Sequence, residues 1–288
     1  MTTNIFPTGK MHISFSEVKA WAECPFRHYL MYVEKINTYN DNPYADFGTA
    51  IHNAIEGFLN GKEFDLDNIF LGLDERWAKQ GYDTPEYIKS VEADRASNGW
   101  KYTHESLEDY KKSAVTIVND FADFMDKTFP DWQPISAEVE LYEPLNETLK
   151  FKGFVDCVIA MPKKPGSEEV EYWVIDWKTT GKTGWFWKKK KEFLSLAQVG
   201  LYKNYWSNKY GIPKKDIRAA YVFLKRGAKA GKSCELLEVA ATPKFLEKTN
   251  TLVKKMISNV QKGVKLKNYN NCTFCPYKGT EHCNGKGW

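Results

Sequence analysis

The feature that most constrains the fold of this 288-residue chain is a change of hydrophobic period near residue 135. From that point three runs have the alternating or continuously apolar character of β-strands, namely ISAEVELYEPL, LKFKGFVDCVIAM and EYWVIDWKTT. The turn-rich segment PKKPGSEE separates the last two, which predicts a three-stranded meander. Helical spacing returns at 192–210 and after Thr242-Pro243, with further strand-like runs at IRAAYVFLK and CELLEVA. Strands with helices before and after them predict an α/β core.

Helical patterns precede the strands. Ser14 and Glu17 have the spacing of a capping box, so we expect a short helix to begin there and to be interrupted at Cys24-Pro25. The run FRHYLMYVEKI predicts a second helix, and DFGTAIHNAIEGFL predicts a third that begins after Gly48.

The segment 60–134 carries an amphipathic helix near 106–129 but no catalytic pattern, and it is interpreted as a helical insertion. No apolar run of the chain approaches the roughly 18 residues of a membrane span. The opening MTTNIFPTGK lacks the order of a secretory signal, so the expected location is the cytoplasm.

Charge is distributed unevenly along the chain. Residues 1–180 hold 18 Lys and Arg against 31 Asp and Glu, whereas residues 181–288 hold 23 against 6. A strongly basic half indicates a polyanionic partner such as nucleic acid, and clustered carboxylates in the acidic half could hold divalent cations. The alternative is that both halves present ordinary solvated faces.

Two aspartates and a lysine carry the most specific chemistry. Residues two apart on a strand point to the same face, so Asp176 and Lys178 in VIDWKTT should project together. Asp156 lies in an apolar run of the preceding strand, where an isolated carboxylate would be costly to bury. Mg²⁺ or Mn²⁺ bound by both aspartates, with the backbone carbonyl of Trp177 as a further ligand, would explain it. Such a site suits phosphodiester hydrolysis, with Lys178 orienting the attacking water; the alternative is a surface ion pair.

The order of four motifs resembles the RecB-like branch of the PD-(D/E)xK nuclease superfamily. These are GxxxH ending at His52, GxxD ending at Asp156, DxK at 176–178, and QxxxY at 198–202. The resemblance implies a restriction-endonuclease-like core, with a four-stranded mixed sheet flanked by helices. It also implies that His52, Asp156 and Asp176 bind metal, with His52 favouring Mn²⁺. Lys178 would be catalytic, Gln198 and Tyr202 would shape the site and contact DNA, and Glu138 or Glu140 would supply an additional acid.

Four of the six cysteines form a second pattern. Cys272, Cys275 and Cys283 lie in CTFCPYKGTEHC near the end of the chain, and Cys24 lies near its start. They resemble the iron-sulfur staple of the AddB nuclease and of the CRISPR-associated RecB-like exonucleases, which implies a 4Fe-4S cluster joining the two ends. A structural Zn²⁺ bound by four cysteines is the alternative. Cys157 and Cys234 fall in strand-like runs, where a thiol behaves as a small hydrophobe.

Basic and aromatic residues are interleaved in WFWKKKK at 185–191 and recur in KRGAKAGK at 225–232. Trp185, Phe186 and Trp187 could stack on bases of a single strand, while the cations follow its phosphates, although each stretch could also be a solvated loop. The cations expected to bind DNA are Lys188, Lys189, Lys190, Lys191, Lys225 and Arg226.

The sequence therefore predicts four segments: N-terminal helices at 1–59, the helical insertion at 60–134, a nuclease core at 135–240, and a C-terminal helix with the cysteines at 241–288. The expected function is a metal-dependent DNA exonuclease that acts on single strands or DNA ends in recombination, repair or replication. The alternative is a DNA-end-binding subunit of a helicase-nuclease or CRISPR-adaptation complex. The chain carries no helicase P-loop, so any unwinding would come from a partner.

Overall fold

The computed structural model describes residues 6–38, 41–97, 99, 101–273 and 275–285. Residues 1–5, on which part of the expectation about a secretory signal depends, lie outside this range. Within it the chain forms a six-stranded mixed sheet in the order β1-β3-β4-β5-β6, with β2 also paired to β3. The strands are β1 (His12–Ser14), β2 (Gln133–Pro144), β3 (Lys150–Pro162), β4 (Val170–Thr180), β5 (Ile217–Lys225) and β6 (Cys234–Glu238).

The pairing confirms the predicted meander and makes the sheet mixed. Strands β2, β3 and β4 pair antiparallel in sequence order, β4 pairs parallel with β5, and β6 returns antiparallel to β5. The expected sheet of four strands is too small. All five strand-like runs of the sequence belong to the sheet. The sixth strand, β1, was missed because it has three residues, too few to show a period; it pairs parallel with Lys150–Lys152.

Helices cover both faces of this sheet. They are α1 (Phe15–Glu23), α2 (Pro25–His28), α3 (Pro43–Leu59), α4 (Leu66–Gln80), α5 (Pro85–Ser97), α6 (Leu107–Thr128), α7 (Phe193–Tyr210) and α8 (Pro243–Gln261). A π-helical turn, η1 (Tyr29–Val33), follows α2 directly, and short 3-10 turns form at η2 (Lys189–Lys191), η3 (Lys214–Asp216) and η4 (Tyr269–Asn271).

Helix starts differ in part from the sequence prediction. Ser14 caps α1 by accepting the Glu17 N–H at 3.4 Å, but the Glu17 carboxylate is buried and lies 3.1 Å from His28 Nε2 instead of closing the capping box. Helix α3 begins at Pro43, earlier than expected, because Asn42 caps it and proline suits the first helical position. Gly48 lies inside that helix.

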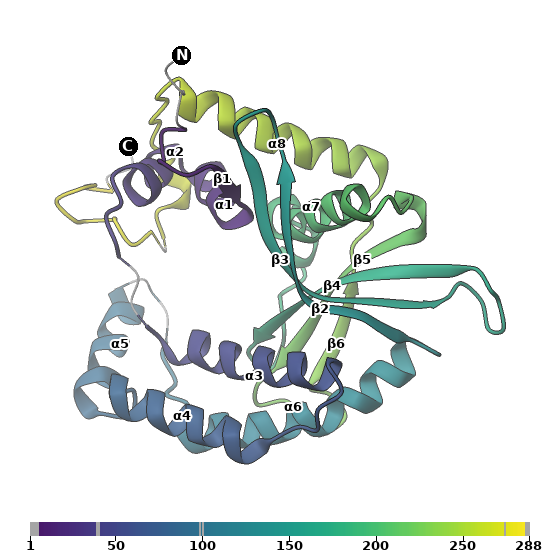
Figure 1. The fold of residues 1–288 in the computed structure, drawn as a ribbon. Coiled ribbons are helices and arrows are strands. Elements are labelled where there is room, and N and C mark those ends of the chain that lie inside the picture. Colours follow the sequence, from purple (N-terminus) through teal and green to yellow (C-terminus); the bar gives the residue numbers. More distant parts are fainter. Residues whose placement is uncertain (1–5, 39–40, 98, 100, 274, 286–288) are drawn as a thin grey trace.

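Helices pack on both faces of the sheet (Figure 1). Buried apolar residues of the described chain form three clusters, one on the first face and two on the second. Helices α3, α4 and α6 pack on the face that carries Ile175 and Trp177. Of these, α4 and α6 belong to the helical segment 60–134. Helices α1, α7 and α8 pack on the face that carries Val174. No helix within the described ranges is long and apolar enough to cross a membrane.

The two ends of the chain meet beside α1 and α2 (Figure 1). Asn268 donates its backbone N–H to Cys24 Sγ at 3.3 Å and its side-chain amide to the Glu23 carbonyl at 2.8 Å. Tyr277 donates its hydroxyl to the Ile36 carbonyl at 2.7 Å. These contacts hold the C-terminal segment against the N-terminal helices.

Candidate active site

Strand β4 places Asp176 and Lys178 on one face. Ile175 and Trp177 turn into the core under α3 and α6, which confirms the predicted alternation. The Asp176 side chain is 2% exposed, and its Oδ2 lies 2.5 Å from Lys178 Nζ. That oxygen accepts no hydrogen bond of ordinary geometry from any described residue. Burial raises the pKa of Asp176, and the Lys178 ammonium opposes this rise.

Asp156 reaches the same place from β3. Its Oδ2 accepts the backbone N–H of Trp177 at 2.7 Å, which fixes the carboxylate beside β4. Burial and the Asp176 carboxylate raise the pKa of Asp156 well above its ordinary value. Each carboxylate makes ionisation of the other less favourable. A divalent cation bound between them would stabilise both in the ionised form.

Helix α3 brings His52 to this pair. His52 Nδ1 lies 3.7 Å from Asp156 Oδ2. Burial, followed by the nearby Lys178 ammonium, lowers the pKa of His52 to about 4. The imidazole is therefore neutral near pH 7, which is the form that binds metals.

Glu138 supplies a third acid opposite Asp156 on β2. Its backbone has φ of +51°, an uncommon conformation for a residue other than glycine. Burial and then the carboxylates of Glu56 and Asp176 raise the pKa of Glu138. Glu140, the alternative, instead pairs with Lys152 at 3.2 Å and is half exposed. Both glutamates are exposed, but Glu138 is influenced by other acids, whereas Glu140 pairs with a lysine.

The position of these acids follows from a local reversal in β2 and β3. Val155 and Val139 face the core under α7 and α8, whereas Cys157 and Ala137, two residues along each strand, face the opposite core. The usual alternation is broken between them on both strands, at Asp156 and Glu138.

Gln198 and Tyr202 enter from α7. Gln198 Nε2 donates to the Tyr202 hydroxyl at 2.9 Å, and the Tyr202 side chain is buried. Burial raises the pKa of Tyr202, so its hydroxyl stays protonated at neutral pH.

These side chains line one cavity of about 350 Å³. Its walls consist of Ser14, Phe15, Ser16, His52, Lys152, Gly153, Phe154, Asp156, Asp176, Lys178, Gln198 and Tyr202. Ser14, Phe15 and Ser16 were not predicted as site residues. The capping-box spacing marks Ser14 only as a helix start, and the approach of this end of α1 to the site follows from the unpredicted pairing of β1 with β3.

The donor set fits a hard divalent cation. Carboxylate oxygens of Asp156 and Asp176 suit Mg²⁺ and Mn²⁺, and a neutral imidazole adds a ligand that Mn²⁺ accepts more readily. The convergence of the two carboxylates with the His52 imidazole in one cavity is the observation that favours this fit. As they stand, no three His, Cys, Asp or Glu side chains in the described part of the chain form a ready metal-ligand group.

A second cavity, of about 520 Å³, adjoins the first. The two share Lys178 and Gln198 in their walls. The second one also contains Lys19, Arg27, Trp185 and Lys189, so cations and an aromatic ring border a continuous path to the acids.

The predicted DNA-binding residues around Trp185 differ in how exposed they are to solvent. Trp185 packs on Tyr221 and Phe223, with ring centroids 5.0 Å apart in each pair, and Lys189 Nζ lies 4.4 Å from its ring centroid. Phe186 and Trp187 are 66% and 69% exposed, and Lys191 Nζ lies 5.8 Å from the Trp187 ring centroid.

Three of the predicted DNA-binding cations form ion pairs within the fold, namely Lys190, Lys225 and Arg226. Lys190 and Lys225 both pair with Glu235. Arg226 corrects the sequence expectation, because its side chain is 6% exposed and pairs with Glu105 at 3.2 Å. Its guanidinium also lies within 6 Å of the ring centroids of Tyr44, Phe47 and Tyr110. A DNA phosphate cannot reach a guanidinium packed in this way.

The four cysteines predicted to bind one cluster line a single cavity of about 20 Å³. Burial and the neighbouring thiols of Cys275, Cys24 and Cys283 raise the pKa of Cys272. In their present positions the thiols do not form a ready metal-ligand group among the described residues. Cluster binding therefore remains a prediction.

Comparison with known proteins identifies the family. The chain is 27% identical over 187 residues to one subunit of the ATP-dependent helicase/deoxyribonuclease of Clostridioides difficile (strain 630), a match that covers 59% of this chain and 16% of that relative. The crystal structure of an exonuclease candidate from Eubacterium rectale is also similar, with 13% identity, a TM-score of 0.49, and coverage of 91% of this chain and 85% of that one. The sequence profile of the PD-(D/E)XK nuclease superfamily matches residues 12–280. The chain belongs to that superfamily.

Proposed function

We propose that the chain is a metal-dependent DNA exonuclease that hydrolyses phosphodiester bonds at single-stranded or free DNA ends. The observation that carries the proposal is the convergence of buried Asp156 and Asp176 with Lys178 in one cavity, beside a neutral His52. These four residues come from two consecutive strands and from α3, which lies far from them in the sequence, and a surface ion pair on β4 would not require this.

The residues divide the chemistry among them. Asp156 and Asp176, with His52 and the Trp177 carbonyl, would hold Mg²⁺ or Mn²⁺, which lowers the pKa of water and offsets charge on the phosphate. Lys178 sits beside Asp176, where it can orient the attacking water and stabilise negative charge on the phosphoryl oxygens. Glu138 adds a carboxyl with a raised pKa at the edge of the same site.

The adjoining cavity supports a single-stranded substrate. Lys189 can neutralise a phosphate, and Trp185 offers a ring for base stacking. Lys19 and Arg27 also line this cavity, where both pair with Glu23. A strand that lies along this path would deliver its end to Asp176. Gln198 borders both cavities, so we assign it, with its hydrogen-bonded partner Tyr202, to positioning the strand.

A DNA-end-binding component of a larger complex is the second candidate. The chain spans only 16% of the length of a relative that is named as part of a helicase/deoxyribonuclease. This favours a role within a larger assembly whose partner would unwind DNA. Intact acids and Lys178 favour cleavage over binding alone, because binding does not need them.

The test is end-labelled single-stranded and duplex DNA incubated with the purified chain and Mg²⁺ or Mn²⁺. Asp176→Asn and Lys178→Met should each lower the cleavage rate by about 100-fold or more while DNA affinity is retained. Asp123→Asn, which alters an exposed acid on α6, should leave the rate unchanged. Undiminished cleavage by both site variants would exclude this active site, and wild-type binding without cleavage would favour the second candidate.

A further inference from the structure

A large cavity lies away from the proposed active site. It has a volume of about 1110 Å³ and opens where β5 begins and β6 ends. Its wall includes residues 217–219 of β5, whereas Asp176 pairs further along that strand with Tyr221. None of the residues that line the proposed active site lines this cavity.

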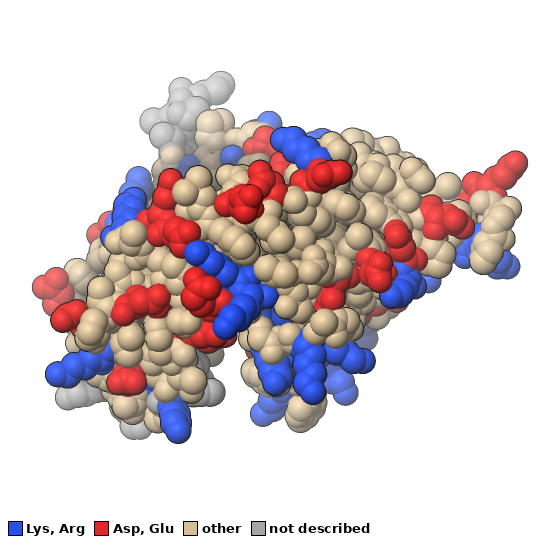
Figure 2. Space-filling view, turned by 90° about the horizontal axis from the view of Figure 1, so that it is seen from below, with Lys and Arg blue, Asp and Glu red and all other residues tan. Residues whose placement is uncertain are grey.

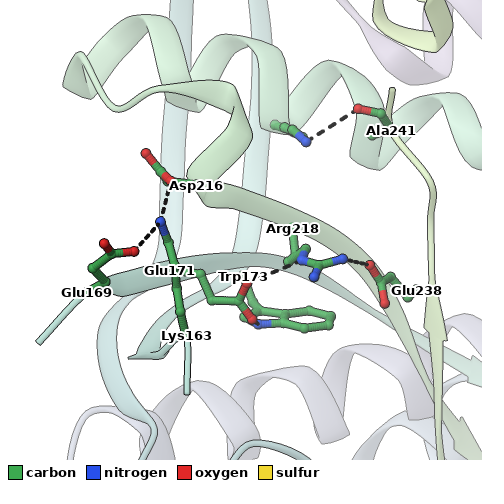
Figure 3. Close-up of polar contacts among 9 residues, drawn as sticks. Lys163, Glu169, Glu171, Trp173, Asp216, Arg218, Glu238 and Ala241 are labelled. Carbon is green, nitrogen blue, oxygen red and sulfur yellow. Dashed lines mark hydrogen bonds and ion pairs between the residues drawn. The ribbon is translucent and has the colours of Figure 1, made fainter. Parts of the chain in front are cut away.

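Ion pairs frame the cavity (Figure 3). Lys163 bridges Asp216 at 2.8 Å and Glu169 at 3.2 Å. Arg218 bridges Glu238 at 2.6 Å and Glu171 at 3.2 Å. The acids in this frame are therefore already paired with cations. Glu247, an exposed residue, is a further acid in the wall.

Lys203 differs from these framing residues. It rises from α7, is only 9% exposed, and makes no ion pair with a described residue within 4.0 Å. Its ammonium donates to the Ala241 carbonyl at 3.3 Å, which leaves two of its three N–H donors without a partner in the described structure. Burial and then the Arg218 charge lower the pKa of Lys203. A buried ammonium with a single neutral acceptor is costly, and an anion in the cavity would offset that cost.

Further cations border the cavity. Lys214, Lys215 and Lys254 are exposed along its rim. Buried Ile217 and Leu246 form part of its wall and offer an apolar surface beside the charges. The cavity is thus large enough for a drug-sized ligand and combines apolar area with a few convergent polar groups.

We propose that this cavity binds a phosphate group, with Lys203 as the buried cation and the rim lysines as secondary contacts. Several ammonium groups without carboxylate partners call for more than one negative charge, which a phosphomonoester dianion supplies in a compact group. Two sources carry this chemistry, a free nucleotide and the phosphorylated end of a DNA strand. The proposal concerns binding only and is independent of whether the Asp176 site cleaves DNA.

Isothermal titration calorimetry of the full chain in EDTA tests the proposal. Deoxyadenosine monophosphate and inorganic phosphate should both bind, and deoxyadenosine, which lacks the phosphate, should not. Lys203→Met should weaken both phosphate-bearing ligands by about 10-fold or more, since a charge-assisted hydrogen bond is lost. Lys255→Met is the matched control, because Lys255 is exposed on α8 next to Lys254 but does not line the cavity.

The variants also separate folding from binding. Methionine has a volume similar to lysine and needs no ion partner, so Lys203→Met should melt no lower than the wild type. If it nevertheless fails to fold, the rim variant Lys254→Met should still weaken binding by a few-fold. Tighter binding of the mononucleotide than of phosphate would identify a nucleotide site, and tighter binding of a 5′-phosphorylated oligonucleotide would identify a strand end. Absence of binding at millimolar ligand, or equal affinity in wild type and Lys203→Met, would overturn the proposal.

Discussion

Single residues set how closely the elements of the site approach. A Cβ at Gly48 would lie 3.0 Å from Thr179 Oγ1, so glycine allows α3 to pack tightly against β4 and to bring His52 to Asp156. A Cβ at Gly153 would lie 2.8 Å from the Tyr202 ring. Close packing therefore explains why Gly48 and Gly153 are glycines, without reference to any family.

Gly153→Ala should consequently destabilise the protein. The new methyl group would also meet the Phe151 ring at 3.1 Å, so Tyr202 or the backbone of β3 must shift. Such overpacking lowers the free energy of unfolding by about 1–3 kcal/mol, which urea denaturation measures. Displacement of Tyr202 should also slow DNA cleavage.

Gly72→Ala is the matched control for this change. Gly72 lies within α4, and a Cβ there would meet nothing within 4 Å. Alanine should raise the free energy of unfolding by about 0.5–1 kcal/mol through helix propensity. Equal stability of Gly153→Ala and the wild type would show that the Tyr202 ring is free to move.

Residue patterns predicted the centre of the site better than its edge. Strict period-two alternation on β4 was enough to place Asp176 and Lys178 on one face. Glu138 has a backbone φ of +51°, a conformation that no side-chain pattern encodes. This is the physical reason why Glu138 and Glu140 could not be distinguished from sequence.

At the scale of elements, the helical segment 60–134 is tied to the nuclease sheet by polar contacts. Asp120 on α6 accepts the backbone N–H of Gly231 at 2.8 Å and the Ser233 hydroxyl at 2.6 Å. Arg226, which follows β5, inserts between rings of α3 and α6. The sequence predicted the helices themselves, from their amphipathic period. It could not predict these ties, because their partners are more than a hundred residues apart.

Asp120→Asn should loosen this connection. Hydrogen bonds to a charged group contribute about 1.5–3 kcal/mol, and partial exposure of Asp120 reduces the expected loss in unfolding free energy to about 1–2 kcal/mol at pH 7. Although burial opposes the effect, hydrogen bonds from Ser233 and Gly231 lower the pKa of Asp120. The stabilisation is therefore present above the ordinary aspartate pKa of 3.8, and it is lost as the pH falls through that value towards the lower folded pKa.

Unfolding free energies of wild type and Asp120→Asn, measured by denaturant titration from pH 7 to pH 3, should therefore converge below about pH 4. Asp123→Asn serves as the control. Asp123 lies on the same helix but forms an exposed pair with Lys127, so its replacement should change stability by less than about 0.5 kcal/mol at any pH. A constant difference in unfolding free energy between wild type and Asp120→Asn from pH 7 to pH 3 would contradict the claim that the negative charge of Asp120 stabilises the fold.

At the scale of the whole molecule, the charge count overstates the surface available to DNA. Residues 181–288 carry 23 Lys and Arg, yet Lys190, Lys225 and Arg226 neutralise acids within the fold. Figure 2 shows Lys and Arg gathered along a notch at the lower edge of the molecule, with Asp and Glu spread over the same face. The sequence fits a polyanionic partner, but only the fold shows which cations remain available, because ion pairing depends on tertiary contacts.

The meeting of the two chain ends leads to the last prediction. Cys24 and the three C-terminal cysteines border one cavity, although about 250 residues separate them. The Asn268 N–H already donates to Cys24 Sγ, as backbone donors do around the sulfurs of iron-sulfur clusters. A 4Fe-4S cluster there would close a long loop and hold the C-terminal segment on α1 and α2, which stabilises the fold by limiting the unfolded chain.

Protein purified without oxygen should therefore be brown and contain about four irons per chain. Cys24→Ser should lose the iron and melt at a lower temperature, whereas Cys234→Ala should keep the iron, because Cys234 lies on β6 outside the cysteine cavity. Iron analysis and thermal unfolding of the three proteins measure both effects. One bound zinc per chain in place of iron would replace the cluster with the structural zinc site. A metal-free protein whose melting temperature is unaffected by Cys24→Ser would show that the hydrogen bonds from Asn268 and Tyr277 are sufficient to hold the two ends together.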